Sequence, residues 1–329
     1  MLLSAGLVCT SSAQPFKLPT ENRAPLQAGA EEQAFAGTAG KSWESGTFGC
    51  VRSGRAQMHE GLDIRCLKRD RRGEPKDEVW ATAPGTVVYI NTRPALSNYG
   101  KYVIIRHVVD GVELFSLYAH LSQFAPGLKP GKQVNGGEII AVMGRTANTK
   151  EGISKDRAHV HFELNLMANE RFPSWYKDRF PEERNDHGLW NGQNLLGIDA
   201  RQVLLEQQTQ GAKFNLMQFI ARQPELCRIT VLKKQFPWLK RYAALVRMNA
   251  IAEKEGIAGY ELALNFNGIP IELIPRAASE LNQKSGYHLV SVNEAEYHKN
   301  PCRHLVAKKS HGGWELTQHG RDLLDLLLD

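Results

Sequence analysis

The pair His159 and His161 lies in a short apolar stretch, with one residue between the two histidines. On a β-strand, side chains two positions apart point to the same face of the sheet, so the two imidazoles would project side by side. Such a pair can place one imidazole on a metal ion and a second imidazole next to it. Alone, the pattern is a weak indicator, because histidines are also common on exposed strands. Two motifs upstream strengthen the indication of a metal site.

The first motif is H-x-x-x-D, from His59 to Asp63, and the second is His120 in the sequence Y-A-H-L. A catalytic zinc usually takes three protein ligands, imidazole or carboxylate, and leaves a fourth position to water. His59, Asp63 and His161 suit this role. Zinc then lowers the pKa of its water and polarises a substrate carbonyl. His120 and His159 would lie beside the metal, take the water's proton and hydrogen-bond the developing oxyanion.

In this order, the three motifs resemble the signature of the lysostaphin-type, or LytM-domain, zinc metallopeptidases. The resemblance extends over residues 45–168. Residues 46–49 are similar to the family's segment before the first ligand, and residues 83–87 are similar to its A-x-G-x-V strand. Residues 131–144 resemble its G-x-x-V-x-x-G-x-x-I-x-x-x-G segment. The combination of motifs is far more specific than any one of them.

The resemblance implies both a fold and an activity. The fold would be mainly β, a twisted antiparallel sheet of the lysostaphin-like, duplicated hybrid-barrel type, with zinc at the floor of a groove. Residue by residue, His59, Asp63 and His161 would bind one Zn²⁺, and His120 and His159 would be the catalytic pair. The family hydrolyses peptide bonds, mostly in the stem peptides or cross-bridges of peptidoglycan. Since all five positions are present, we expect an active zinc metalloendopeptidase with peptidoglycan as its partner and no nucleic acid.

Glu163 and His107 are candidates for supporting roles in the second shell of the metal. Glu163 would face the same side of its strand as the two histidines and could orient a ligand, although a solvent-facing position is an equal alternative. His107 could lie near the site or have a structural role. Residues 66–78 and 148–157 are long and charged. We interpret them as solvated loops or as opposite rims of a substrate groove.

The length of 329 residues predicts two domains. Residues 45–199 are dense in short β-branched and aromatic runs between Gly and Pro turns, which favours an antiparallel sheet. Helical spacing begins after residue 199, so residues 200–329 are predicted to form a smaller α+β domain of unknown role. Residues 14–44 lack periodicity and are predicted to be an extended leader.

The N-terminus has a short apolar run followed by small residues, and Ser11 and Ala13 have the spacing of a cleavage site. Residues 1–13 are therefore expected to be a signal peptide, the alternative being a disordered or core N-terminus. This predicts an exported protein, periplasmic or extracellular and associated with the cell wall. No stretch is long enough to span a bilayer, so we expect no transmembrane anchor.

Cysteine usage is compatible with export. Of the five cysteines, four remain if the chain is cleaved after Ala13. An even number permits disulfides, but the sequence does not give their pairing. The hypothesis that keeps each pair within one domain is Cys50 with Cys66 and Cys227 with Cys302.

Composition leaves two other functions open. The net charge of +6 is mild and favours contact with an acidic surface, such as an anionic cell-wall polymer or nucleic acid, without choosing between them. One alternative is a non-hydrolytic regulator that binds the cell wall or an amidase through a preserved groove. The other is a secreted peptidase that acts on proteins. A complete set of ligands argues against the regulator.

Overall fold

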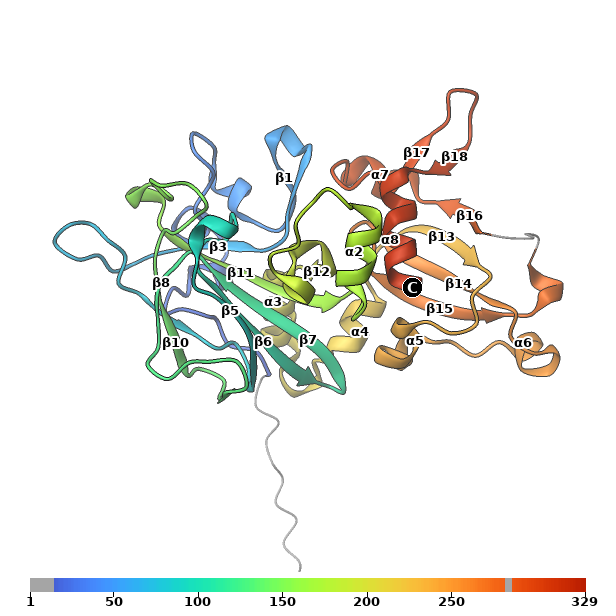
Figure 1. Cartoon of the computed structure of the whole chain (residues 1–329), viewed down its shortest axis with the longest axis horizontal. Helices are drawn as coiled ribbons and strands as arrows, with labels where there is room; N and C mark the ends of the chain where they lie inside the picture. The colour runs from blue at the N-terminus through green and yellow to red at the C-terminus, as the bar shows by residue number, and fades with distance from the viewer. Residues whose placement is uncertain (1–14, 282–285) are drawn as a thin grey trace, which may run out of the picture.

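The computed structural model describes residues 15–281 and 286–329, so the signal peptide predicted at residues 1–13 lies outside the described residues. Figure 1 shows two β-sheet regions beside one another, one from the blue and green N-terminal part and one from the orange C-terminal part. All strand pairs within the sheets are antiparallel. The sheets are open, and the described residues form no closed barrel. The predicted mainly β, antiparallel fold class is confirmed.

The largest sheet has seven strands. In spatial order they are β12 (Leu195–Ile198), β11 (His159–Met167), β7 (Val112–Ala119), β6 (Tyr102–Val109), β5 (Gly85–Asn91) and β9 (Gln133–Val134), with β3 (Leu62–Arg65) also paired to β11. The turn between β6 and β7 has two residues, Asp110 and Gly111, both with positive φ, the conformation that a type I′ hairpin turn requires. This tight turn fixes the register of the two eight-residue strands.

Two smaller sheets flank the large one. They are the three-stranded sheet of β4 (Glu78–Trp80), β10 (Ile139–Met143) and β8 (Leu121–Phe124), and the hairpin of β1 (Gly49–Arg52) and β2 (Gln57–His59). Strand β11 is buried along its whole length, because β3 and β7 cover its edges and apolar residues cover its faces. Side chains on β11 are therefore held in a rigid environment.

Residues 15–44 contain the short helices η1 (Ala24–Leu26), α1 (Glu31–Ala34) and η2 (Trp43–Gly46). Phe16 and Phe35 from this segment are fully buried. The backbone of Phe16 exchanges two hydrogen bonds of 2.7 Å with the side chain of Gln207. The segment predicted as an extended leader thus contributes to the core, because its apolar residues find partners far along the chain.

The C-terminal part combines a four-stranded sheet with helices. The sheet order is β15 (Pro270–Arg276), β14 (Gly259–Asn265), β13 (Glu225–Val231) and β16 (Tyr287–Val292), and β17 (Val306–Lys308) forms a hairpin with β18 (Trp314–Leu316). The α-helices after β11 are α2 (Phe172–Arg179), α3 (Ala200–Gln210), α4 (Leu216–Ala221), α5 (Pro237–Arg241), α6 (Ala250–Glu255), α7 (Glu294–Lys299) and α8 (Gln318–Leu328). Short 3-10 turns are η3 (Ser53–Arg55), η4 (Pro94–Leu96), η5 (Lys155–Arg157), η6 (Gly188–Trp190), η7 (Gly192–Asn194), η8 (Gly211–Lys213), η9 (Ala243–Leu245) and η10 (Ala278–Glu280). None of the helices within the described ranges is long and apolar enough to cross a membrane.

Helix α8 joins the C-terminal part to the rest of the molecule, and it lies beside α2 in Figure 1. Its leucines are buried, and Asn169 donates a 2.7 Å hydrogen bond to the carbonyl of Leu326. Arg179 and Asp322 form a two-pronged ion pair of 2.8 and 3.0 Å between α2 and α8. The buried residues of both parts form one connected core. The domain boundary near residue 199 therefore stays a prediction.

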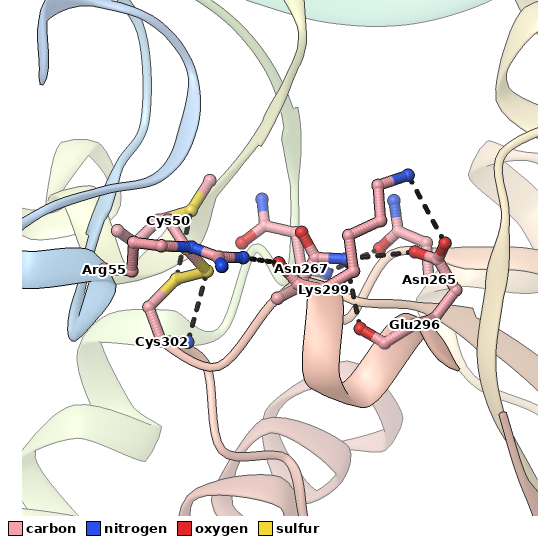
Figure 2. Close-up of a disulfide and its surroundings, with 9 residues drawn as sticks. Cys50, Arg55, Asn265, Asn267, Glu296, Lys299 and Cys302 are labelled. Atoms are coloured by element: carbon pink, nitrogen blue, oxygen red, sulfur yellow. Dashed lines mark hydrogen bonds and ion pairs between the residues drawn. A yellow bond between two sulfur atoms is a disulfide. The ribbon is translucent and has the colours of Figure 1, made fainter. Parts of the chain in front are cut away.

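One disulfide, Cys50–Cys302, crosses 252 residues of sequence and ties β1 to the loop after α7 (Figure 2). The predicted pairings of Cys50 with Cys66 and of Cys227 with Cys302 are wrong, and Cys66 and Cys227 are free thiols. The prediction assumed that disulfides stay within a domain. Instead, the hairpin of β1 and β2 extends to the C-terminal part, where Arg55 also hydrogen-bonds the carbonyl of Lys299.

Replacement of Cys302 by serine should lower the free energy of unfolding by about 2–4 kcal/mol, since the disulfide restricts the unfolded chain over a long loop. Urea denaturation of the oxidised protein measures this loss. Cys66→Ser is the matched control and should leave stability within about 0.5 kcal/mol. Equal stability of the Cys302→Ser protein and the wild type would contradict the disulfide.

Candidate metal centre

Three predicted ligands, His59, Asp63 and His161, converge at one point. Asp63 on β3 lies directly opposite His161 on β11, and His59 ends β2 just before the turn into β3. The Oδ1 atom of Asp63 lies 3.1 Å from Nε2 of His59 and 2.9 Å from Nδ1 of His161. The two imidazole nitrogens are 3.0 Å apart. All three side chains are buried.

The turn between His59 and Asp63 depends on Gly61. A Cβ at this position would lie 2.5 Å from the carbonyl oxygen of Phe162 on β11. Only glycine allows β3 to approach β11 closely enough for Asp63 and His161 to meet.

These three side chains fit a zinc ion. Two imidazole nitrogens and a carboxylate oxygen lie within 4.8 Å of one another, and this is a donor set that zinc commonly takes. Burial lowers the pKa of His161, but hydrogen bonds to Asp63 and Glu163 outweigh it and raise the pKa to about 9. The pKa of Asp63 is held well below its usual range because the surrounding histidines outweigh the effect of burial. The centre thus concentrates negative charge and attracts a cation.

The outer nitrogen of each histidine ligand is also hydrogen-bonded. Nδ1 of His59 donates to the carbonyl of Thr47 over 2.7 Å, and Nε2 of His161 donates to Glu163 over 2.6 Å. These bonds leave Nε2 of His59 and Nδ1 of His161 to face the centre. Such contacts fix the ring orientation and tautomer of metal-binding histidines. Glu163, expected either to orient a ligand or to face solvent, contacts His161.

Three further residues contact the centre and were missed in the sequence. Arg52 pairs with Oδ2 of Asp63 at 2.5 Å, opposite the oxygen that faces the histidines. Tyr99 and Asn165 each donate a 2.7 Å hydrogen bond to Glu163. Asn165 had a sequence signal, since it follows Glu163 by two positions on the same face of the strand. Arg52 is the last residue of β1 and Tyr99 lies in a turn, and no periodicity indicates either contact.

His120 and His159 lie next to each other beside the three ligands, with ring centroids 4.9 Å apart. Nδ1 of His120 donates to the carbonyl of Thr146, and Nδ1 of His159 donates to the carbonyl of Arg157. Burial lowers the pKa of both imidazoles, and the neighbouring His159 lowers that of His120 further. Both rings are therefore neutral near pH 7, and each has a free Nε2 able to accept a proton.

His107 is not brought to this cluster. Its Nδ1 donates to the carbonyl of Pro84, and its Nε2 hydrogen-bonds the hydroxyl of Ser116 over 2.6 Å. The ring is buried in the seven-stranded sheet, where it connects β6 to β7 and to the residue before β5.

The two charged loops form one unit rather than opposite rims. Glu74 in the first loop binds Arg145 through two bonds of 2.8 and 3.2 Å and pairs with Lys155 of the second loop at 3.3 Å. Because β3 pairs with β11, the loop that follows β3 and the loop that precedes β11 leave the sheet at the same end. They meet on the side of His159.

The family comparison agrees with this geometry. Residues 57–173 match the model of peptidase family M23. The match contains all five histidine and aspartate positions of the cluster. The resemblance to lysostaphin-type metallopeptidases is thereby confirmed for this segment. No curated protein matches the chain.

Solved structures give short matches. A zinc-containing peptidase from Vibrio cholerae is 26% identical with a TM-score of 0.24, over 32% of this chain and 26% of that chain. The catalytic domain of lysostaphin from Staphylococcus simulans is 25% identical with a TM-score of 0.25, over 32% of this chain and 66% of that chain. The chain thus covers less than two thirds of either structure. TM-scores this low do not support a structural relationship, so the similarity to family M23 depends on the match to the family model.

The buried His107 makes stability depend on pH. Burial lowers its pKa to about 4, whereas an imidazole in the unfolded chain titrates near 6.5. Between these values the unfolded chain binds the extra proton, so stability falls as the pH falls from about 6.5 towards 4, by up to about 3 kcal/mol.

Urea denaturation at pH 7 and pH 4.5 should show that His107→Gln loses less free energy of unfolding on acidification than the wild type. His298→Gln, at an exposed position, is the control and should keep the full loss. If His107→Gln lost as much stability on acidification as the wild type, other groups would be the cause.

Proposed function

We propose that this protein is a zinc-dependent metalloendopeptidase that hydrolyses peptide bonds in peptidoglycan cross-links or stem peptides, exported to the cell wall. The observation that carries the proposal is the convergence of His59, Asp63 and His161 beside the neutral pair His120 and His159. The match to peptidase family M23 supports peptidase activity. The complete set of donors argues against a purely non-hydrolytic regulator.

In this mechanism, His59, Asp63 and His161 hold the ion, and bound zinc supplies an acidified water and a polarised substrate carbonyl. The unprotonated Nε2 atom of either His120 or His159 accepts the water's proton and returns it to the leaving amine. The other histidine donates a hydrogen bond to the developing oxyanion only after its own Nε2 has taken up a proton, because its Nδ1 proton is already donated to a backbone carbonyl. The two histidines are not equivalent, since Nε2 of His159 lies 3.4 Å from Oδ1 of Asp63.

The contacts around the ligands keep this arrangement rigid. Arg52 fixes Asp63, Thr47 fixes His59, and Glu163 fixes His161. Because each partner is itself held by the sheet or by a second hydrogen bond, the site needs little reorganisation when substrate binds. Glu163 is accordingly proposed as a positioning residue rather than a catalytic one.

Glu163→Gln should weaken zinc affinity about 10- to 100-fold, because the amide is a poorer acceptor for the Nε2 proton of His161. Competition against a chelator measures the affinity directly. Glu182→Gln, at an exposed glutamate, is the matched control. Equal zinc affinity of Glu163→Gln and wild type would remove Glu163 from this role.

The test of the function is product analysis of purified cross-linked peptidoglycan by mass spectrometry. The zinc-loaded wild type should convert cross-linked muropeptides to monomers. His159→Ala should retain one zinc per chain, since His159 is not a ligand, and should lose turnover. Near-full activity of His159→Ala would refute its catalytic role. Cleavage of proteins but not of peptidoglycan would favour a secreted peptidase for proteins, and a purified protein that takes up no zinc would favour the regulator.

A further inference from the structure

A cavity of about 390 Å³ lies between the peptidase segment and the C-terminal part. This volume is in the range of small-molecule binding sites. One wall comes from α2 and β12, and the other comes from α8 and the loop after α7. Most of the lining is apolar, and includes Trp175, Phe180, Leu195, Leu196, Leu323 and Leu326.

Three charged side chains line this cavity, Glu60, Arg303 and Asp322, together with the imidazole of His319. Asp322 is paired with Arg179. Among residues 15–281 and 286–329, nothing hydrogen-bonds the buried Nε of Arg303, and no carboxylate forms an ion pair with its guanidinium. Burial lowers the pKa of Arg303, and the more distant Glu60 partly offsets this effect. A guanidinium stays charged at neutral pH, so an unpaired one in such surroundings is costly.

An unsatisfied acceptor lies next to the cavity. Asn267 is 2% exposed, and its Nδ2 donates a 2.7 Å hydrogen bond to the carbonyl of Gly197. Its Oδ1 is buried, and no described residue donates to it. This oxygen has almost no accessible surface, so Asn267 lines the cavity through its other atoms.

The disulfide fixes Arg303 in place. Arg303 directly follows Cys302, which is bonded to Cys50 at the base of β1 (Figure 2). The backbone N–H of Cys302 also donates to Sγ of Cys50. Arg303 thus belongs to a covalently braced segment.

We propose that this cavity binds a small zwitterion, an apolar amino acid or a dipeptide with free ends. The carboxylate of the ligand would pair with Arg303, and its ammonium group would face Glu60. Its apolar side chain would lie against Trp175 and Phe180. A simple anion would satisfy Arg303 but leave the negative charge of Glu60 facing it. The site is separate from the proposed metal centre, since His59, Asp63 and His161 do not line the cavity.

Isothermal titration of the full, zinc-loaded protein tests the proposal. The probes are leucine and alanylalanine, the latter in its L and D forms, with N-acetyl and C-terminal amide derivatives of each. The unmodified probes should bind in the millimolar range or tighter. Amidation removes the carboxylate and should weaken binding at least about tenfold, as expected for the loss of a charge-assisted hydrogen bond. The comparison of leucine with alanylalanine distinguishes an amino acid from a dipeptide.

Arg303→Gln should weaken the binding of the unmodified probes by the same factor. Arg321 is an exposed arginine on α8, and Arg321→Gln should leave their binding unchanged. The ligand derivatives keep the test decisive if Arg303→Gln fails to fold. No binding of any probe, equal binding of the amides, or equal binding of inorganic phosphate would overturn the proposal. Binding is measured without turnover, so its failure is distinguishable from failure of the proposed peptidase activity.

Discussion

The antiparallel pairing of β3 with β11 is the constraint on which the rest of the site depends. It places Asp63 opposite His161, and a shift of one residue would turn these side chains to the other face of the sheet. The register has little freedom, because β11 is buried along its length and held by β7 on its other edge. Gly61 allows the close approach of the two strands. The metal centre is thus a product of sheet packing as much as of its ligands.

Around this pairing, each of the four histidines has one ring nitrogen bonded to a fixed acceptor. The acceptors come from four separate segments, which supply three backbone carbonyls and the carboxylate of Glu163. Backbone carbonyls belonging to turns are insensitive to the identity of their own side chains. The orientation of three of the rings is therefore specified by the course of the chain. Glu163 and Arg52 are the exceptions, since their side chains themselves contact His161 and Asp63.

The sequence predicted what local spacing determines. The i, i+2 pair His159 and His161, the H-x-x-x-D motif and the alternation along the sheet are short-range patterns, and the antiparallel fold and the clustering of the five residues agree with them. The features that the sequence did not predict depend on long-range packing. The disulfide of Cys50 with Cys302 and the burial of Phe16 against Gln207 join residues with no local relation. The contact between the two charged loops was also missed, because their common origin in the β3–β11 pair is visible only once the pairing is known.

The separation of Cys50 from Cys302 has a consequence for biosynthesis. A chain is synthesised from its N-terminus, so Cys50 is incorporated long before Cys302. During that interval Cys66 is the thiol nearest to Cys50 along the chain, and a disulfide between these two would be non-native. A protein built in this way benefits from an isomerase, or from oxidation delayed until synthesis is complete. The order of synthesis, and not only the final structure, then decides how much of the chain reaches its native form.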